Sequence, residues 1–147
     1  MSVHRATWSI VSALLLFALN AQAAPHAEEK PAAKATLKVT VIHAQNARPG
    51  IDPKLKSIGE YLTKSFDKFK GFTQLGAHEA QVALGAKTST TLPDGKTLTL
   101  AFKGQSKGFV KVYVEIDGLK TTVDVRDGGL FFQAGRVFKA GILVLAI

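Results

Sequence analysis

Few residues in the chain combine the types and spacings that catalysis needs. The sequence has no cysteine, which excludes a thiol nucleophile, a disulfide framework, an iron–sulfur cluster and a thiolate zinc site. Residues 85–88 (Gly-Ala-Lys-Thr) differ from a phosphate-binding loop, because an alanine separates the glycine from the lysine. His43 and His78 form no short-range ligand pair, and no Gly-x-Ser-x-Gly motif occurs. The sequence therefore predicts no catalytic residue, no metal site and no cofactor.

Four of the six aspartates occupy positions that turns and helix starts require. Asp94, Asp117 and Asp127 each precede a glycine, and this pair of residues is typical of tight turns. Asp52 precedes Pro53, and this order is typical of the first residues of a helix. A pair of carboxylates free for general acid–base catalysis is therefore not predicted.

The turn at Asp117-Gly118 fixes the most informative register in the sequence. A two-residue turn here joins a strand at 109–116 to a strand at 119–126. One side of this hairpin is apolar and becomes the core face, whereas the other side carries two opposite-charge pairs and a ring–guanidinium pair. The core-side pairs are Ile116 with Leu119, Val114 with Thr121, Val112 with Val123 and Val110 with Val125. The outer pairs are Glu115 with Lys120, Tyr113 with Thr122, Lys111 with Asp124 and Phe109 with Arg126.

The next turn, Asp127-Gly128, extends the same register to residues 130–134. It predicts that Phe131 lies opposite Asp124 on the outer face. That face would then combine stacking surfaces with positive charge, which can bind an acidic polymer, a glycan or a protein edge. The alternative is that another segment covers these aromatic side chains. The candidate binding residues are Phe109, Lys111, Tyr113, Lys120, Arg126 and Phe131.

The elements that must position this face begin with a strand and an amphipathic helix. Alternating apolar residues over Thr36–Ala44 predict the first strand. Asp52-Pro53 then starts a helix that ends near Lys70-Gly71. The apolar residues of this helix recur every three or four positions, so they form one stripe that needs a sheet to cover. The stripe consists of Leu55, Ile58, Leu62, Phe66 and Phe69.

Further strands complete the predicted sheet. Residues 72–84, 88–92 and 98–102 read as strands, with a Pro-Asp-Gly turn before the last of them. The unbroken apolar run at 142–147 predicts a strand that is buried on both faces. The predicted fold is a single α+β domain in which one amphipathic helix packs on a mainly antiparallel sheet of roughly six to eight strands.

The N-terminal residues resemble an export signal rather than part of the fold. His4 and Arg5 precede an apolar stretch, and Ala21-Gln22-Ala23 has the small-x-small pattern of a cleavage site. The rival interpretation, an uncleaved membrane anchor, is disfavoured because the apolar run is shorter than the roughly 20 residues that span a bilayer. We therefore predict a signal peptide at 1–23, a flexible linker at 24–35 and one domain at 36–147, without a transmembrane span in the mature protein.

Composition and charge narrow the function without identifying it. The chain has 46% hydrophobic residues and a formal net charge of +8, which favours a folded basic domain. We predict an exported, non-enzymatic bacterial protein, periplasmic or secreted, that binds an envelope or secreted protein or an anionic polymer such as a glycan. Nucleic acid is a third possible ligand, which export makes less favoured. The alternative function is a small secreted hydrolase, or an inhibitor of one.

Overall fold

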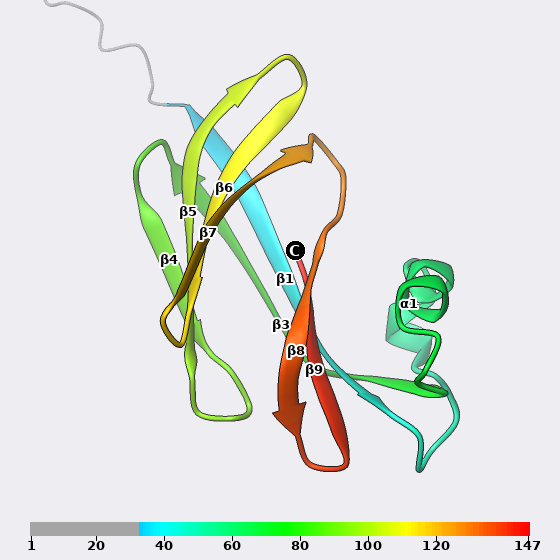
Figure 1. Ribbon diagram of the computed structural model, residues 1–147. Coiled ribbons are helices and arrows are strands. Elements are labelled where there is room, and N and C mark those ends of the chain that lie inside the picture. The colour runs from blue at the N-terminus through cyan, green and yellow to red at the C-terminus, as the bar shows by residue number, and fades with distance from the viewer. Residues whose placement is uncertain (1–32) are drawn as a thin grey trace, which may run out of the picture.

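Two β-sheets and one short helix make up the described part of the chain. The computed structural model describes residues 33–147, so the predicted signal peptide and most of the predicted linker lie outside the described residues. One sheet has five strands in the order β2-β3-β1-β9-β8, and the other has four in the order β4-β5-β6-β7 (Figure 1). The strands are β1 (Lys34–Gln45), β2 (Gly50–Ile51), β3 (Gly71–Ala83), β4 (Lys87–Thr91), β5 (Thr97–Ser106), β6 (Phe109–Ile116), β7 (Leu119–Arg126), β8 (Phe132–Phe138) and β9 (Gly141–Ala146).

Strand β9 and the second half of β1 are buried on both faces. In β1, Leu37, Val39 and Val41 pack into the core between the two sheets. In the pairing of β1 with β3, the register shifts between Val41 and Ile42. After this shift, Ile42 packs into a second core on the opposite face of the sheet. Strand β9 divides in the same way: Leu143 and Leu145 join the first core, whereas Val144 and Ala146 join the second. The prediction that the last apolar run is buried on both faces is confirmed.

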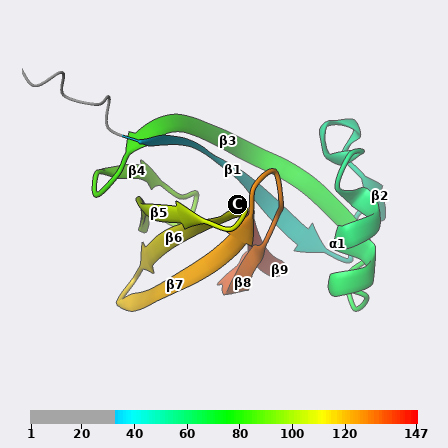
Figure 2. The same ribbon diagram turned by 90° about the horizontal axis from the view of Figure 1, so that it is seen from above.

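The two cores lie on opposite faces of the five-stranded sheet. The first fills the space between the sheets, and its largest fully buried side chain is that of Phe102 on β5. The second lies under the helical segment, where Leu55 and Leu62 pack with Phe72 of β3. Figure 2 shows α1 (Gly59–Ser65) at one end of the long strands β1 and β3, away from the four-stranded sheet. The four-stranded sheet therefore keeps an outer face that α1 does not cover.

The helix is much shorter than its apolar stripe predicts. Asp52 caps a single 3₁₀ turn, η1 (Pro53–Leu55), by accepting a hydrogen bond of 3.0 Å from the backbone nitrogen of Lys54. Regular α-helix is confined to α1, and the chain leaves helical geometry at Phe66, whose φ and ψ are −130° and 53°. The ring of Phe66 packs edge-on against that of Phe132 on β8, 5.5 Å between centroids. The apolar stripe therefore does pack against the sheet. The residues of the stripe on either side of α1 make this contact from non-α-helical backbone.

The fold class is mostly β rather than one helix on one sheet. The described residues form nine strands, more than the predicted six to eight, and these divide into two sheets. All strand pairs are antiparallel except β2 with β3. Alternation reveals that a strand has one apolar face, but it does not reveal which of two sheets the strand joins. Strand β1 begins at Lys34, two residues before the predicted start of the domain.

The register predicted after Asp127-Gly128 is wrong. Strand β8 pairs with β9 rather than with β7. The backbone of Gly129 donates to the carbonyl of Arg126 over 2.6 Å, and the chain then crosses to the five-stranded sheet. There Phe131 exchanges two backbone hydrogen bonds with Ile147, of 2.9 and 3.0 Å. Pairing with β9 closes the open edge of the most apolar strand, which a return along β7 would have left unpaired.

Across residues 33–147, we find no helix with the length and hydropathy to cross a membrane.

Truncation of the buried Leu62 of α1 should destabilise the domain far more than truncation of the neighbouring, exposed Tyr61. We expect Leu62→Ala to lower the free energy of unfolding by about 2–5 kcal/mol, because the side chain is fully buried in the second core. Tyr61→Ala should change it by less than about 0.5 kcal/mol, since Tyr61 is 62% exposed. Urea denaturation measures both values, and equal losses would contradict the proposed packing of α1.

Candidate functional site

The β6–β7 hairpin confirms every pair that the sequence predicts between residues 109–116 and 119–126. Asp117 and Gly118 both have positive φ, 47° and 83°, as the tight two-residue turn requires. The register runs without a shift from Ile116 opposite Leu119 to Phe109 opposite Arg126. On the outer face, the ion-pair and ring–guanidinium distances are 3.3 Å for Lys111–Asp124, 3.7 Å for Lys120–Glu115 and 5.8 Å for Arg126 over the ring of Phe109.

Tyr113 lies at the centre of this outer face between two lysines that the sequence analysis did not identify. The ammonium groups of Lys87 and Lys103 lie 5.8 and 5.6 Å from the centroid of its ring. The register explains the position of Lys87, because Lys87 is opposite Ala101 and Ala101 is opposite Tyr113. Lys87 belongs to β4 and Lys103 to β5. Strand β5 joins β6 through a two-residue turn at Lys107-Gly108, both with positive φ, which the sequence analysis did not recognise. The alternation of these strands is the signal that could have found Lys87.

The phenol of Tyr113 is also tied to a carboxylate. Its hydroxyl donates a hydrogen bond of 2.9 Å to Glu115. That bond raises the pKa of Tyr113 above its ordinary value, and burial and the charge of Glu115 act in the same direction. The phenol therefore stays neutral at physiological pH, and the half-buried ring contributes to the face mainly through the two ammonium groups over it.

A basic hollow lies beside Tyr113 on the same four-stranded sheet. It has a volume of about 600 Å³ and is lined by residues of β5, β6 and the turn between them, with Asp124 of β7. The register of β5 and β6 shifts between Phe102 and Gly104, next to Lys103. The charged lining of the hollow consists of three lysines and one carboxylate. The ring of Phe109, which also lines the hollow, is 42% exposed. The lysines are Lys103, Lys107 and Lys111.

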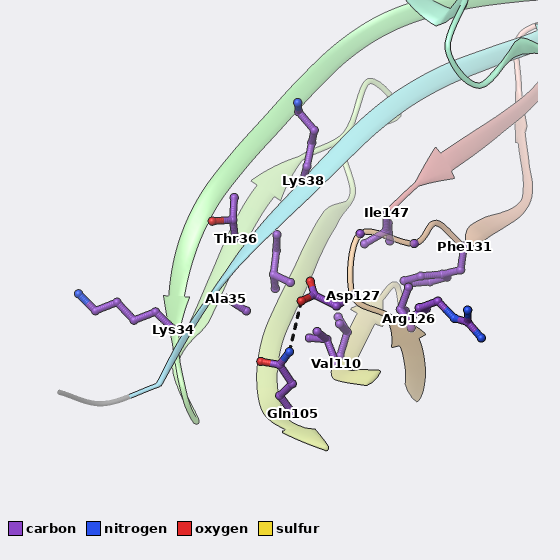
Figure 3. A pocket seen from close by; sticks show the side chains of 15 residues that line it. Lys34, Ala35, Thr36, Lys38, Gln105, Val110, Arg126, Asp127, Phe131 and Ile147 are labelled. Atoms are coloured by element: carbon purple, nitrogen blue, oxygen red, sulfur yellow. Dashed lines mark hydrogen bonds between the residues drawn. The ribbon is translucent and has the colours of Figure 1, made fainter. Parts of the chain in front are cut away.

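Phe131 does not belong to this face, although the sequence register predicts it there. It packs against the core between the sheets and lines a groove of about 420 Å³ at one end of the sandwich (Figure 3). Lys34 and Lys38 of β1 line the same groove, and Gln105 donates a 3.4 Å hydrogen bond to Asp127 there. The structure thus brings together five of the six predicted site residues on the outer face. Phe131 lies off that face, in a groove whose lining it shares with one of the five, Arg126.

The opposite end of the sandwich is closed by a charge cluster centred on Arg136 of β8. Its Nε donates to Asp94 in the β4–β5 turn over 2.6 Å, and its Nη1 donates to Asp117 in the β6–β7 turn over 3.3 Å. Lys96 pairs with Asp117 at 3.0 Å. Burial alone would raise the pKa of Asp94, but the bonds from Arg136 and the backbone of Lys96 outweigh burial, so the pKa is lowered. This cluster ties the two sheets together, and its role is structural.

The two histidines of the domain lie apart and have different surroundings. His43 is opposite Thr73 whereas His78 is opposite Val39, which places them at separate points along β1 and β3. The ring of His43 packs edge-on against Phe138, and Nε2 of His78 lies 3.0 Å from the hydroxyl of Thr88. Within the described residues, no three side chains of metal-ligating type form a group.

Comparisons with protein-family models, with curated proteins and with solved structures found no match to this chain.

Loss of the Arg136 cluster should destabilise the domain in a pH-dependent way. We expect Arg136→Met to lower the free energy of unfolding at pH 7 by about 1–3 kcal/mol, because Asp94 would stay largely buried without its partner. The lowered pKa values of Asp94 and Asp117 contribute stability above the ordinary value of 3.8, and this contribution disappears as pH falls through the lower folded-state values. The wild-type advantage should therefore be constant above about pH 5 and shrink toward about pH 2.

Urea denaturation across this pH range measures the difference. Arg48→Met, at an exposed arginine with no carboxylate within 4.0 Å among residues 33–147, is the matched control and should show no such pH dependence. A wild-type advantage over Arg136→Met that stays constant down to pH 2 would exclude the cluster as its source.

Proposed function

We propose that this protein is an exported, non-enzymatic domain that binds an anionic glycan through the outer face of its four-stranded sheet. This surface, the basic aromatic face, is defined by Lys87, Lys103, Lys107, Phe109, Lys111, Tyr113, Lys120 and Arg126. The observation that carries the proposal is the arrangement at its centre, where Lys87 and Lys103 flank the ring of Tyr113. Two ammonium groups held beside an aromatic ring offer a sugar charge for its acidic substituents next to an apolar contact.

The charge balance of this face supports an anionic ligand. Its two carboxylates are already paired, Asp124 with Lys111 and Glu115 with Lys120. Within residues 33–147, Lys87, Lys103 and Lys107 have no carboxylate within 4.0 Å, and neither has Arg126. These four cations lose no internal ion pair when they contact a ligand, and a cluster of one sign raises the local concentration of anions.

The shape of the face supports a polymer rather than a small molecule. The cations are spread over the outer side of all four strands of one sheet, and the hollow beside Phe109 opens on the same side. A chain with repeated charges can contact several of them at once, so that weak contacts add up. Export, proposed from the pattern of residues 1–23, favours an envelope or extracellular glycan over nucleic acid.

Reversal of the two charges beside Tyr113 should abolish most of the binding. We expect Lys87→Glu/Lys103→Glu to raise the Kd for a sulfated or carboxylated glycan, such as heparin or alginate, at least about tenfold at low salt. The matched control is Lys56→Glu/Lys68→Glu, which changes net charge by the same amount on exposed lysines of the helical segment. Isothermal titration calorimetry of the protein purified from the full-length gene compares the three forms.

Two outcomes of this titration would contradict the proposal. Equal losses in both double variants would mean that net charge, and not the basic aromatic face, determines binding. Tighter binding to duplex DNA than to either glycan, at matched salt, would assign the face to phosphate rather than to an acidic glycan.

A further inference from the structure

Strand β7 presents an eight-residue edge that the described residues leave unpaired along its whole length, whereas the free side of β3 beyond Phe72 follows a strand whose register shifts against β1. Four strands lie at sheet edges: β2, β8, β4 and β7. Of these, β2 has two residues, β4 has five, and β8 carries a register shift between Ala134 and Arg136. Strand β7 has eight residues, no proline and an uninterrupted register against β6. Short length, bulges, proline and charged side chains are the usual protections of an edge, and β7 has only the last of these, in Lys120, Asp124 and Arg126.

The turn at Asp117-Gly118 determines which backbone groups of this edge are free. In a two-residue hairpin the flanking pair, here Ile116 and Leu119, exchanges hydrogen bonds, and bonded pairs then recur at every second residue. Leu119 and its odd-numbered neighbours therefore bond to β6. The amides and carbonyls of Lys120, Thr122 and Asp124 point away from β6, toward the open edge.

The sequence of β7 is complementary to itself in one antiparallel register. With Thr122 opposite the same residue of a second copy, Lys120 lies opposite the second copy's Asp124, and the pair repeats by symmetry. If the second copy's strand is shifted by two residues in one direction, Lys120 lies opposite Arg126, a pair of like charges. If it is shifted by two residues in the other direction, Lys120 lies opposite Thr122 and no charge pair forms. Odd shifts place apolar residues opposite polar ones and misalign the free backbone groups. One register thus satisfies the charges and the hydrogen bonds together.

The charges already present on the outer face continue across this contact. Within one copy, Glu115 pairs with Lys120, and Asp124 pairs with Lys111. Pairing of two β7 strands joins these into a row in which negative and positive side chains alternate over four strands. Opposite charges directly across two strands stabilise a sheet, and like charges destabilise it.

The inner side of the edge supplies apolar complementarity. Leu119 is 45% exposed although it lies on the same side of β7 as core-packed Val123 and Val125. In the self-complementary register, Leu119 lies opposite Val125 of the second copy, and Thr121 lies opposite Val123. The contact would therefore cover an apolar side chain that the single chain leaves in water.

We propose that the protein forms a symmetric dimer through antiparallel pairing of β7 with β7 of a second copy. The two four-stranded sheets become one continuous eight-stranded sheet, and the two basic aromatic faces become one surface. The dimer does not depend on the glycan proposal, since the pairing uses the edge of the sheet and needs no ligand.

Thr122→Pro tests the backbone contact. The nitrogen of Thr122 points away from β6, so proline there blocks a second strand without removing a bond of the hairpin. We expect sedimentation velocity over a concentration series to show a dimer of the wild-type protein, and a dimer Kd at least about tenfold higher for the variant. Ser89→Pro on the edge strand β4 is the matched control and should leave the Kd within about twofold. A monomeric wild type up to about 500 µM would overturn the proposal, as would an unaltered Kd in Thr122→Pro.

Mixing two charge variants tests the register. In Lys120→Asp two carboxylates meet at each contact, and in Asp124→Lys two ammonium groups meet, so each variant alone should dissociate at least about tenfold more readily. An equimolar mixture should restore the dimer, because each contact then joins opposite charges. The internal ion pairs are altered equally in the separate and the mixed proteins, so folding defects cannot produce this recovery. A mixture as monomeric as its components would overturn the register, and an extended peptide from another protein would then be the better occupant of the edge.

Discussion

Burial of β9 and the second half of β1 on both faces is the constraint on which the rest of the structure depends. A strand with apolar side chains on both sides needs two coverings, and this chain provides the four-stranded sheet on one side and the helical segment on the other. Pairing of β8 with β9 follows from the same need, because it satisfies the second edge of β9. The four-stranded sheet is then left with an outer face that no other element among residues 33–147 covers, and this face carries the candidate site.

Local patterns predict the parts of this fold that local forces determine. The Asp117-Gly118 turn and the alternation on both sides of it are sufficient to place every pair of the β6–β7 hairpin. Asp52 and Pro53 mark the start of the helical segment in the same way. The division into two sheets depends on contacts between residues distant in sequence, which periodicity does not encode. For this reason the predicted position of Phe131 is wrong. The two lysines beside Tyr113 were missed for a local reason, because the register of β4, β5 and β6 was not worked out from their alternation and turns.

The charge excess of the chain has several separate roles in the structure. Arg136 and Lys96 hold the turns at one end of the sandwich against β8. Lys111 and Lys120 pair with carboxylates across the β6–β7 hairpin. The cations that remain on the basic aromatic face include those beside the rings of Tyr113 and Phe109, and they make this face the best candidate for recognition of an anion. Because no cysteine is present, packing and these polar contacts must stabilise the domain without disulfides.

The central claim, that the outer face of the four-stranded sheet is the binding surface, is tested most directly by mapping the contact residue by residue. Titration of ¹⁵N-labelled protein with a sulfated oligosaccharide, followed by NMR, reports every backbone amide at once. The account predicts that the largest shift changes cluster at Lys87, Lys103 and Tyr113, with the amides of α1 unchanged. Changes confined to α1 or to the groove beside Lys34, or no saturable change at all, would contradict it.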